Sequence, residues 1–98
     1  MVGLELISIS DIMKLSRQHL ATLKSIFADP VRASMAWIDI EALLRACGAE
    51  ISAGSGSRVR VALRGRRAVF HRPHPRKETD KGAVKSIRRF LIEVEIMP

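Results

Sequence analysis

Residues 58–71 read RVRVALRGRRAVFH, with apolar and basic side chains interleaved on both sides of Arg64-Gly65. In the first half, every second residue from Val59 to Leu63 is apolar, which is typical of a strand with one buried face. Arg64-Gly65 predicts a two-residue hairpin loop, although arginine fits its first position less well than asparagine or aspartate. The stretch therefore predicts two antiparallel strands joined by a tight turn.

The pairing of these two strands follows from the position of the turn. If Leu63 faces Arg66, then Arg58 faces His71 at the other end of the hairpin. Because successive side chains point to opposite faces, the hairpin has one apolar and one basic face. The apolar face, which we expect to meet the helices, holds Val59, Val61, Leu63, Ala68 and Phe70. The basic face holds Arg58, Arg60, Arg67 and His71.

The N-terminal half of the chain predicts two helices. Apolar residues recur at helical spacing over about residues 11–28, and Ser10 and Asp11 are suitable N-caps. A second apolar run covers residues 37–47, and Gly48 is suited to end it in the left-handed conformation. Two amphipathic helices are therefore expected before the basic half.

The rest of the chain predicts one more strand and a last helix. Residues 49–53 are predicted to form a short strand. Apolar residues recur at helical spacing over about residues 83–94, and Asp80 is suited to cap this helix. The segments predicted to be irregular are residues 31–36, 54–57 and 71–82. The expected fold class is α+β, with the order helix, helix, three antiparallel strands, helix.

Composition limits the size and the class of the protein. The chain has 98 residues, of which 47% are hydrophobic and 28% charged, as in an ordinary globular domain. This length excludes a multidomain enzyme. The single cysteine, Cys47, cannot form a disulfide within the chain and predicts an intracellular protein with a structural thiol. We expect a cytoplasmic protein with no membrane association, because no segment resembles a signal peptide or a membrane span.

The positive charge is concentrated in the second half of the chain. The net charge is +7, yet residues 1–50 carry five basic and six acidic side chains. Residues 51–98 carry twelve basic and four acidic side chains. Clustered arginines favour partners rich in phosphate, because the guanidinium group matches phosphate oxygens and binding releases counterions. Nucleic acid or an acidic protein is therefore the expected partner, and a solvated basic face with no partner is the alternative.

Two motifs in this basic half resemble the HicA family of toxin–antitoxin ribonucleases. The strand pair VRVALRGRRAVF is similar to the family's hairpin, and HPRKETDKGAVKSI is similar to its signature at the start of the last helix. The signature positions are His74, Pro75, Glu78, Lys81, Gly82, Ser86 and Ile87. The resemblance covers residues 37–91 and divides the chain into an N-terminal extension, residues 1–34, and a HicA-like domain, residues 35–98.

The resemblance implies both a fold and an activity. The fold would be that of double-stranded-RNA-binding domains, α-β-β-β-α with both helices on one face of the sheet, here with an extra N-terminal helix. The activity would be cleavage of mRNA without a metal cofactor, which arrests translation. The implied partners are mRNA and a HicB-type antitoxin that covers the active face. Three scattered histidines, without a cluster of cysteines or carboxylates, likewise do not predict a zinc site.

The chain departs from the family at the catalytic position. Family members usually carry a histidine directly after the Gly-Ser turn, and this chain has Arg58 there. A guanidinium group binds phosphate and stabilises a developing oxyanion, but only an imidazole exchanges protons near neutral pH. The candidate catalytic residues are therefore Arg58, His71 and His74. The structural alternatives are that His71 is only a polar strand end and that His74 only fixes its loop.

The remaining candidates concern binding. The expected RNA-binding residues are Arg60, Arg67, Arg72, Arg76, Lys77, Lys81 and Lys85. Two other functions stay open: a catalytically weak or inactive RNA-binding module of the same fold, and a protein-interaction role of the N-terminal helix in dimerisation or antitoxin binding. The serines of GSGS, residues 54–57, have no adjacent base in the sequence and indicate only a flexible turn.

Overall fold

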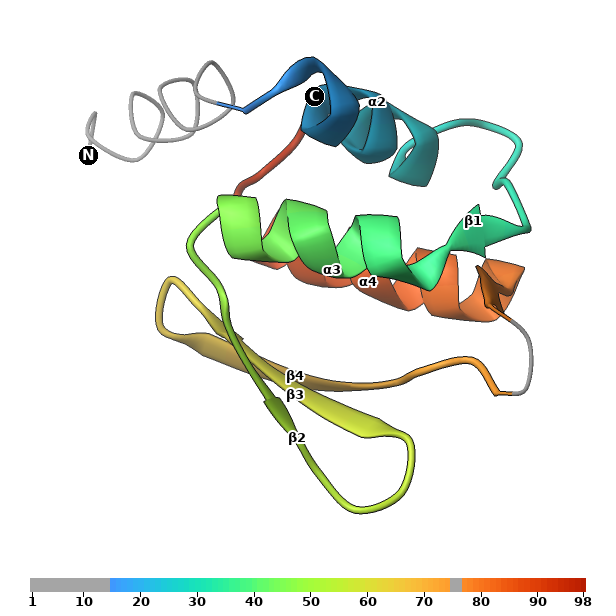
Figure 1. Cartoon of the computed structure of the whole chain (residues 1–98). Helices are drawn as coiled ribbons and strands as arrows, with labels where there is room; N and C mark the ends of the chain where they lie inside the picture. Colours follow the sequence, from blue (N-terminus) through green and yellow to red (C-terminus); the bar gives the residue numbers. More distant parts are fainter. Residues whose placement is uncertain (1–14, 75–76) are drawn as a thin grey trace.

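The computed structural model describes residues 15–74 and 77–98. It has α+β architecture, with three helices and a three-stranded antiparallel sheet among the described residues (Figure 1). In chain order the elements are α2 (Arg17–Ile26), β1 (Met35–Ala36), α3 (Trp37–Ala46), β2 (Glu50–Ala53), β3 (Arg58–Leu63), β4 (Arg66–His71), β5 (Glu78–Thr79) and α4 (Lys81–Glu93).

The predicted hairpin register is confirmed. The sheet has the order β2-β3-β4, and Leu63 faces Arg66 while Arg58 faces His71. Arg64 and Gly65 have φ angles of 52° and 78°, so both loop residues are left-handed, as a type I′ turn requires. Arg64 also donates a hydrogen bond from Nη1 to the carbonyl of Val94, at 2.8 Å. The arginine that fits the turn poorly therefore fastens the hairpin to the end of α4.

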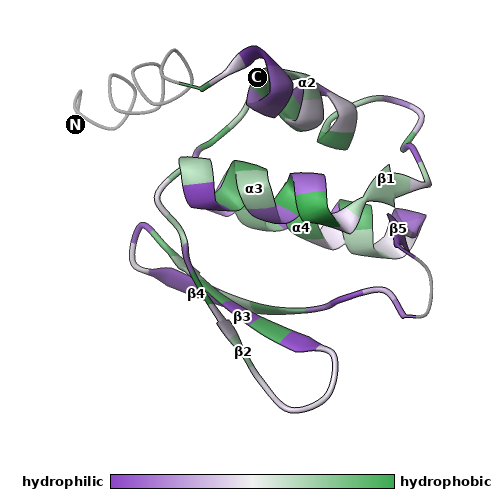
Figure 2. Ribbon diagram, viewed as in Figure 1, coloured by the Kyte–Doolittle hydropathy of each residue, from purple (hydrophilic) through white to green (hydrophobic). Residues whose placement is uncertain are grey.

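The two faces of the sheet are as different as the pattern predicts. Helices α3 and α4 cover one face and leave the other open (Figure 1), and hydrophobic and hydrophilic segments alternate along the hairpin (Figure 2). On the covered face Val59, Val61, Leu63 and Phe70 are buried and Ala68 is half-buried. On the open face Arg58, Arg60, Arg67 and His71 are exposed. Val69 also lies on the open face, with 55% of its surface exposed.

Within the described residues, the helix predicted over about residues 11–28 is present as α2, Arg17–Ile26. Helix α2 begins at Arg17, because the hydroxyl of Ser16 accepts the backbone N–H of His19 and caps the helix there. The expectation of one continuous helix from about residue 11 is therefore wrong across residues 15 and 16. The N-caps predicted at Ser10 and Asp11 lie outside the described residues.

Helix α2 packs on the far side of α3 and α4 from the sheet (Figure 1). Its residues Leu23 and Ile26 are fully buried in the same core as the sheet residues. Arg88 of α4 donates from Nε to the carbonyl of Ile26 and from Nη2 to that of Ala28, each at 2.8 Å. Its guanidinium also lies 5.7 Å from the ring centre of Phe27. Arg88 thus caps the C-terminus of α2, and α2 is an integral layer of the fold.

Two segments expected to be irregular pair with each other. Met35 faces Thr79 and Ala36 faces Glu78 in a two-residue ladder, β1 with β5. The backbone N–H of Trp37 extends the ladder by donating to the carbonyl of Lys77 at 3.1 Å. A ladder this short carries no hydrophobic period, so the sequence pattern could not reveal it. It fixes the start of α3 beside the start of α4.

The helix ends near the sheet follow the predictions. Asp80 caps α4 by accepting the N–H of Ala83 at 2.8 Å. Gly48 has a φ of 99° after the end of α3, and the next N–H, of Ala49, returns to the carbonyl of Leu44. Trp37 is buried at the start of α3, and Cys47 is half-buried against the core. Helices α3 and α4 therefore have the predicted caps at these two ends.

Candidate nucleic-acid interface

The open face of the sheet presents its side chains in three rows across the strands. One row holds Arg58 and His71, the next holds Ser52, Arg60 and Val69, and the third holds Glu50, Ala62 and Arg67. Neighbouring rows are about 7 Å apart, because each residue advances a strand by roughly 3.3 Å. Each row therefore contributes one arginine to a positively charged track along the hairpin.

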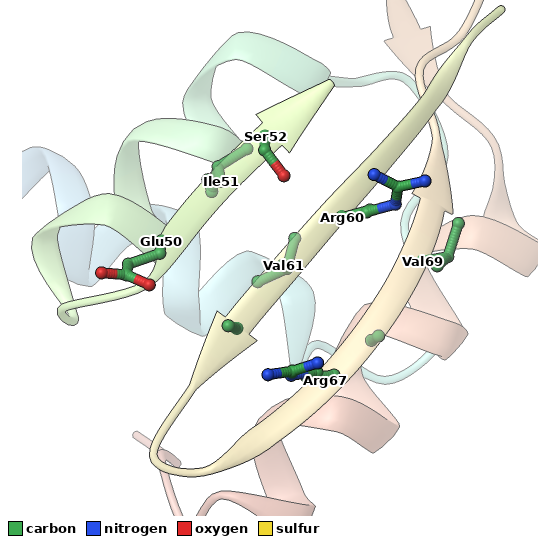
Figure 3. A pocket seen from close by; sticks show the side chains of 9 residues that line it. Glu50, Ile51, Ser52, Arg60, Val61, Arg67 and Val69 are labelled. Atoms are coloured by element: carbon green, nitrogen blue, oxygen red, sulfur yellow. The ribbon is translucent and has the colours of Figure 1, made fainter. Parts of the chain in front are cut away.

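A hollow of about 630 Å³ lies along the second and third rows. Residues of all three strands line it, among them Ser52, Arg60 and Arg67. Figure 3 shows the guanidinium groups of Arg60, on β3, and Arg67, on β4, on the same side of the sheet, away from the helices. Guanidinium groups in an open hollow are suited to bind phosphate oxygens or carboxylates.

The first row brings together two of the three candidate catalytic residues. Arg58 and His71 are direct partners at the end of the β3–β4 ladder, and both are exposed. The backbone continues this pairing for one more step, because the N–H of Arg72 donates to the carbonyl of Ser57 at 2.8 Å. Arg58 and His71 thus occupy paired positions on the open face, and both side chains are exposed to solvent.

Ser57 is a site residue that the sequence reasoning missed. Its Oγ lies 3.3 Å from Nδ1 of His71, within hydrogen-bond distance. We expected the serines of the Gly-Ser turn to have no adjacent base, and the structure contradicts this for Ser57. Extending the predicted register by one residue pairs Ser57 with Arg72, and strict alternation puts the Ser57 side chain on the face away from His71, so the sequence pattern did not predict this contact.

His74 does not join this pair. It is exposed in the loop after β4 and lines a separate hollow of about 330 Å³ with Ser34, Pro73 and Glu78. The residues that line this hollow include neither Arg58 nor His71. The structure therefore separates the two candidate histidines into two surroundings, of which only that of His71 includes an arginine of the sheet face.

Arg72, an expected RNA-binding residue, is already engaged by a carboxylate. Its Nε lies 2.8 Å from Oε2 of Glu41 on α3, and its Nη2 lies 3.4 Å from Oε1. The indole N–H of Trp37 donates to the same carboxylate, and Arg45 lies 3.7 Å from it. The hydrogen bond from Arg72 lowers the pKa of Glu41 below its ordinary value of 4.5; burial opposes this change and the Trp37 N–H adds to it. This ion pair ties the end of β4, next to His71, to α3.

The Glu41 contacts predict a loss of stability in acid. Because the pKa of Glu41 is lower in the folded protein than in the unfolded chain, its ionised form stabilises the fold above pH 4.5. That contribution disappears as the pH falls through the folded value. At pH 7 we expect the unfolding free energy of Glu41→Gln to be about 1 kcal/mol below that of the wild type. When the pH falls from 7 to 3.5, the unfolding free energy of Glu41→Gln should decrease less than that of the wild type. Urea unfolding at both pH values measures this.

The comparison variant for that experiment is Glu50→Gln, which removes an exposed carboxylate of β2. If the unfolding free energies of Glu41→Gln and Glu50→Gln differ equally from that of the wild type at both pH values, the Arg72 ion pair does not stabilise the fold. A larger effect of Glu41→Gln would establish the ion pair as the tie between α3 and β4.

The lysines expected to bind RNA lie away from the open sheet face. Lys81 and Lys85 are exposed on α4, one helical turn apart, and Lys77 is exposed just before β5. Arg76 lies outside the described residues. Helix α4 covers the inner face of the sheet, yet its first two turns share a groove of about 420 Å³ with His71, lined in part by Gly82 and Ser86. Lys81 and Lys85 each directly precede, in the sequence, a residue that lines this groove.

Among residues 15–74 and 77–98, no group of three or more histidine, cysteine, aspartate or glutamate side chains could hold a metal ion. None of the helices in the same residues has the length and apolar character that a membrane span requires.

Comparison with known proteins gives one match. The model of a family described as the HicA toxin of bacterial toxin–antitoxin systems matches residues 37–94. No curated protein and no solved structure matches the chain. The matched segment is more than half of the chain, and it runs from the first residue of α3 to the C-cap of α4. It includes the whole three-stranded sheet and excludes α2.

Proposed function

The chain belongs to the HicA family of toxins of bacterial toxin–antitoxin systems, and we propose that it acts as a metal-independent endoribonuclease that cleaves mRNA in the cytoplasm. Members of such systems have a cognate antitoxin. The antitoxin of this chain is, in the proposal, a HicB-type protein that covers the open sheet face.

The observation that carries the proposal is the pairing of Arg58 with His71. RNA is cleaved when the ribose 2′-oxygen attacks the adjacent phosphorus, so that a bond from O2′ to phosphorus forms and the bond to O5′ breaks. The attacking hydroxyl must lose a proton, and the leaving O5′ must gain one. His71 takes the proton from the 2′-hydroxyl, while Arg58 binds the non-bridging oxygens, whose charge increases in the transition state. Water protonates the leaving oxygen in this scheme.

The rest of the open face supports binding of the RNA chain. Arg60 and Arg67 follow Arg58 at intervals of about 7 Å along the track, which suits contacts to successive phosphates. In the described residues the rings of Trp37, Phe70 and Phe90 are buried, so none of these three offers a stacking surface for bases. Contacts to the backbone are therefore expected to dominate, and we propose that Lys77, Lys81 and Lys85 add to them. Arg76, also expected to bind RNA, lies outside the described residues.

A second function is favoured by one observation, the arginine at position 58. The resemblance places a histidine there in most members, and an arginine does not exchange protons near neutral pH. If His71 does not replace that histidine, the protein is an RNA-binding module without activity. Such a module would still bind RNA, or the antitoxin, through the same face.

Incubation of the purified full-length protein with mixed mRNA in EDTA separates the two functions. Cleavage that persists in EDTA and leaves 2′,3′-cyclic phosphate ends supports the ribonuclease. Intact RNA that still shows a salt-sensitive gel shift supports the binding module. Intact RNA with no shift at low salt rejects both functions.

The double variant Arg60→Ala/Arg67→Ala tests the binding track. We expect affinity for single-stranded RNA to fall about tenfold or more at 0.1 M salt, because two phosphate contacts are lost. The slope of log K against log salt concentration should fall by about 1.4, since each contact to a single strand contributes roughly 0.7. Fluorescence anisotropy over a salt series measures both quantities.

The control for the binding track is Arg17→Ala, which removes an exposed arginine of α2 on the far side of α3 and α4 from the sheet. Its affinity and salt slope should match those of the wild type. Equal losses in Arg17→Ala and in the double variant would mean that RNA binding depends on total charge and not on the open face.

A further inference from the structure

The side chain of His71 has two ring nitrogens, and the contact with Ser57 is made by Nδ1. Nδ1 lies 3.3 Å from Oγ of Ser57, at the end of the Gly-Ser turn. A neutral imidazole carries its proton on only one nitrogen, and the hydrogen bond made at one nitrogen decides which nitrogen that is. The contact with Ser57 therefore bears on which atom of His71 can take up a proton.

We infer that Ser57 is a positioning residue, whose hydroxyl accepts the Nδ1–H of His71 and leaves Nε2 unprotonated toward the substrate. The inference rests on the proposed function for its catalytic meaning. In this arrangement Nε2 takes the proton of the 2′-hydroxyl, and the resulting imidazolium keeps its bond from Nδ1 to Ser57. One hydrogen bond then holds the ring in place before and after proton transfer.

The backbone around Ser57 holds this serine in place without help from its side chain. Its carbonyl accepts the N–H of Arg72 at 2.8 Å, directly after His71. The next residue, Arg58, begins β3 and donates its N–H to the carbonyl of Ser55 at 3.1 Å. Ser57 is thus fixed between the turn and the ladder, so truncating its side chain removes the hydroxyl without moving the backbone.

A close backbone contact fixes the arginine of the same site. The N–H of Gly54 donates to the carbonyl of Arg58 at 2.9 Å, and a Cβ at position 54 would lie only 3.1 Å from the Cβ of Arg58. Glycine therefore lets the turn approach Arg58 closely. The Gly-Ser turn thus contacts both members of the Arg58–His71 pair, one through Gly54 and the other through Ser57.

The chain supplies a matched control for the Ser57 hydroxyl. Ser55 is an exposed serine of the same turn, and it contributes its carbonyl to the turn. The test compares the wild type, Ser57→Ala, Ser57→Thr and Ser55→Ala in the full-length protein. Long-range ¹H–¹⁵N NMR of the imidazoles at pH 8 gives the ratio of Nδ1–H to Nε2–H tautomers of His71. Cleavage of one defined RNA gives the rate over a range of pH.

In the wild type and in Ser55→Ala we expect the Nδ1–H tautomer to predominate. In Ser57→Ala the fraction of this tautomer should fall at least about twofold, and the cleavage rate about three- to tenfold, because one neutral hydrogen bond is lost. Ser57→Thr restores the hydroxyl and should recover both the tautomer ratio and the rate.

The tautomer ratio and the cleavage rate test two different claims. An unchanged tautomer ratio in Ser57→Ala overturns the inference, whatever the activity. A changed ratio with an unchanged cleavage rate overturns the positioning role. A changed ratio with no cleavage by any of the four proteins supports the assigned orientation of His71 and rejects the proposed ribonuclease instead.

Discussion

Replacing His71 by alanine is expected to lower the rate of RNA cleavage at least about 100-fold, because general acid–base catalysis typically contributes 10²–10⁴. Affinity for RNA should change by less than about threefold, since Arg58, Arg60 and Arg67 keep their contacts with phosphate. Single-turnover cleavage in EDTA and anisotropy with the same RNA measure the two effects separately. A loss of rate without a loss of binding identifies His71 as the group that moves the proton.

His74→Ala and His19→Ala are the matched controls for this experiment. His74 lies in the neighbouring loop hollow, and His19 lies on α2, beyond the helices that cover the sheet. Both variants should cleave RNA within about threefold of the wild-type rate, since neither removes the proton carrier. If His74→Ala abolishes cleavage and His71→Ala does not, the proton carrier lies in the loop, and the ladder pair of Arg58 and His71 is only a binding site.

The contrast between His71 and His74 shows what a sequence can and cannot predict about such a site. The pairing of Arg58 with His71 was predictable, because a two-residue turn and a period of two fix every partner along a hairpin. The surroundings of His74 were not, because they depend on the pairing of β1 with β5, which is only two residues long. Sequence periodicity predicts positions only within helices and strands, and His74 lies in the loop between β4 and β5.

The sequence also does not predict which arginines are engaged by contacts within the protein. Sequence composition treats Arg72 and Arg88 as part of one basic surface, yet each has a partner that only the tertiary fold supplies. Arg72 binds the carboxylate of Glu41, which lies 31 residues earlier. Arg88 binds backbone carbonyls at the end of α2, about 60 residues earlier. Charge counting therefore overestimates the surface available to RNA, whereas Arg58, Arg60 and Arg67 are exposed because the hairpin register places them so.

The extent of the folded unit also differs from the extent of the family match. The match begins at residue 37, with α3. Helix α2 nevertheless buries Leu23 and Ile26 completely and receives two hydrogen bonds from Arg88. The division into an extension of residues 1–34 and a domain of residues 35–98 stays a prediction for function. For packing, α2 contributes to the same core as α3, α4 and the sheet.

This packing predicts that Leu23→Ala destabilises the whole protein. Leu23 has no exposed surface, and truncating such a side chain removes its burial and leaves a cavity, at a cost of about 3 kcal/mol. For a domain of this size that loss lowers the melting temperature by roughly 12 °C or more. Urea unfolding, followed by far-UV circular dichroism and by Trp37 fluorescence, should show one cooperative transition at a lower midpoint with both probes. Trp37 lies at the start of α3, so its fluorescence reports on that helix. If the fluorescence midpoint falls by as much as the circular dichroism midpoint, α2 and α3 unfold together.

Two further variants decide whether α2 belongs to the core. Leu44→Ala removes an equally buried leucine of α3, inside the family match, and should cost about as much as Leu23→Ala. Gln18→Ala, on the exposed side of α2, should change the stability by less than about 0.5 kcal/mol. A Leu23→Ala variant that unfolds like Gln18→Ala would mean that α2 only rests on a self-sufficient domain. A cost like that of Leu44→Ala means that α3 and α4 depend on α2 to exclude water from the face they turn away from the sheet, so the helices that support the Arg58–His71 pair depend on it too.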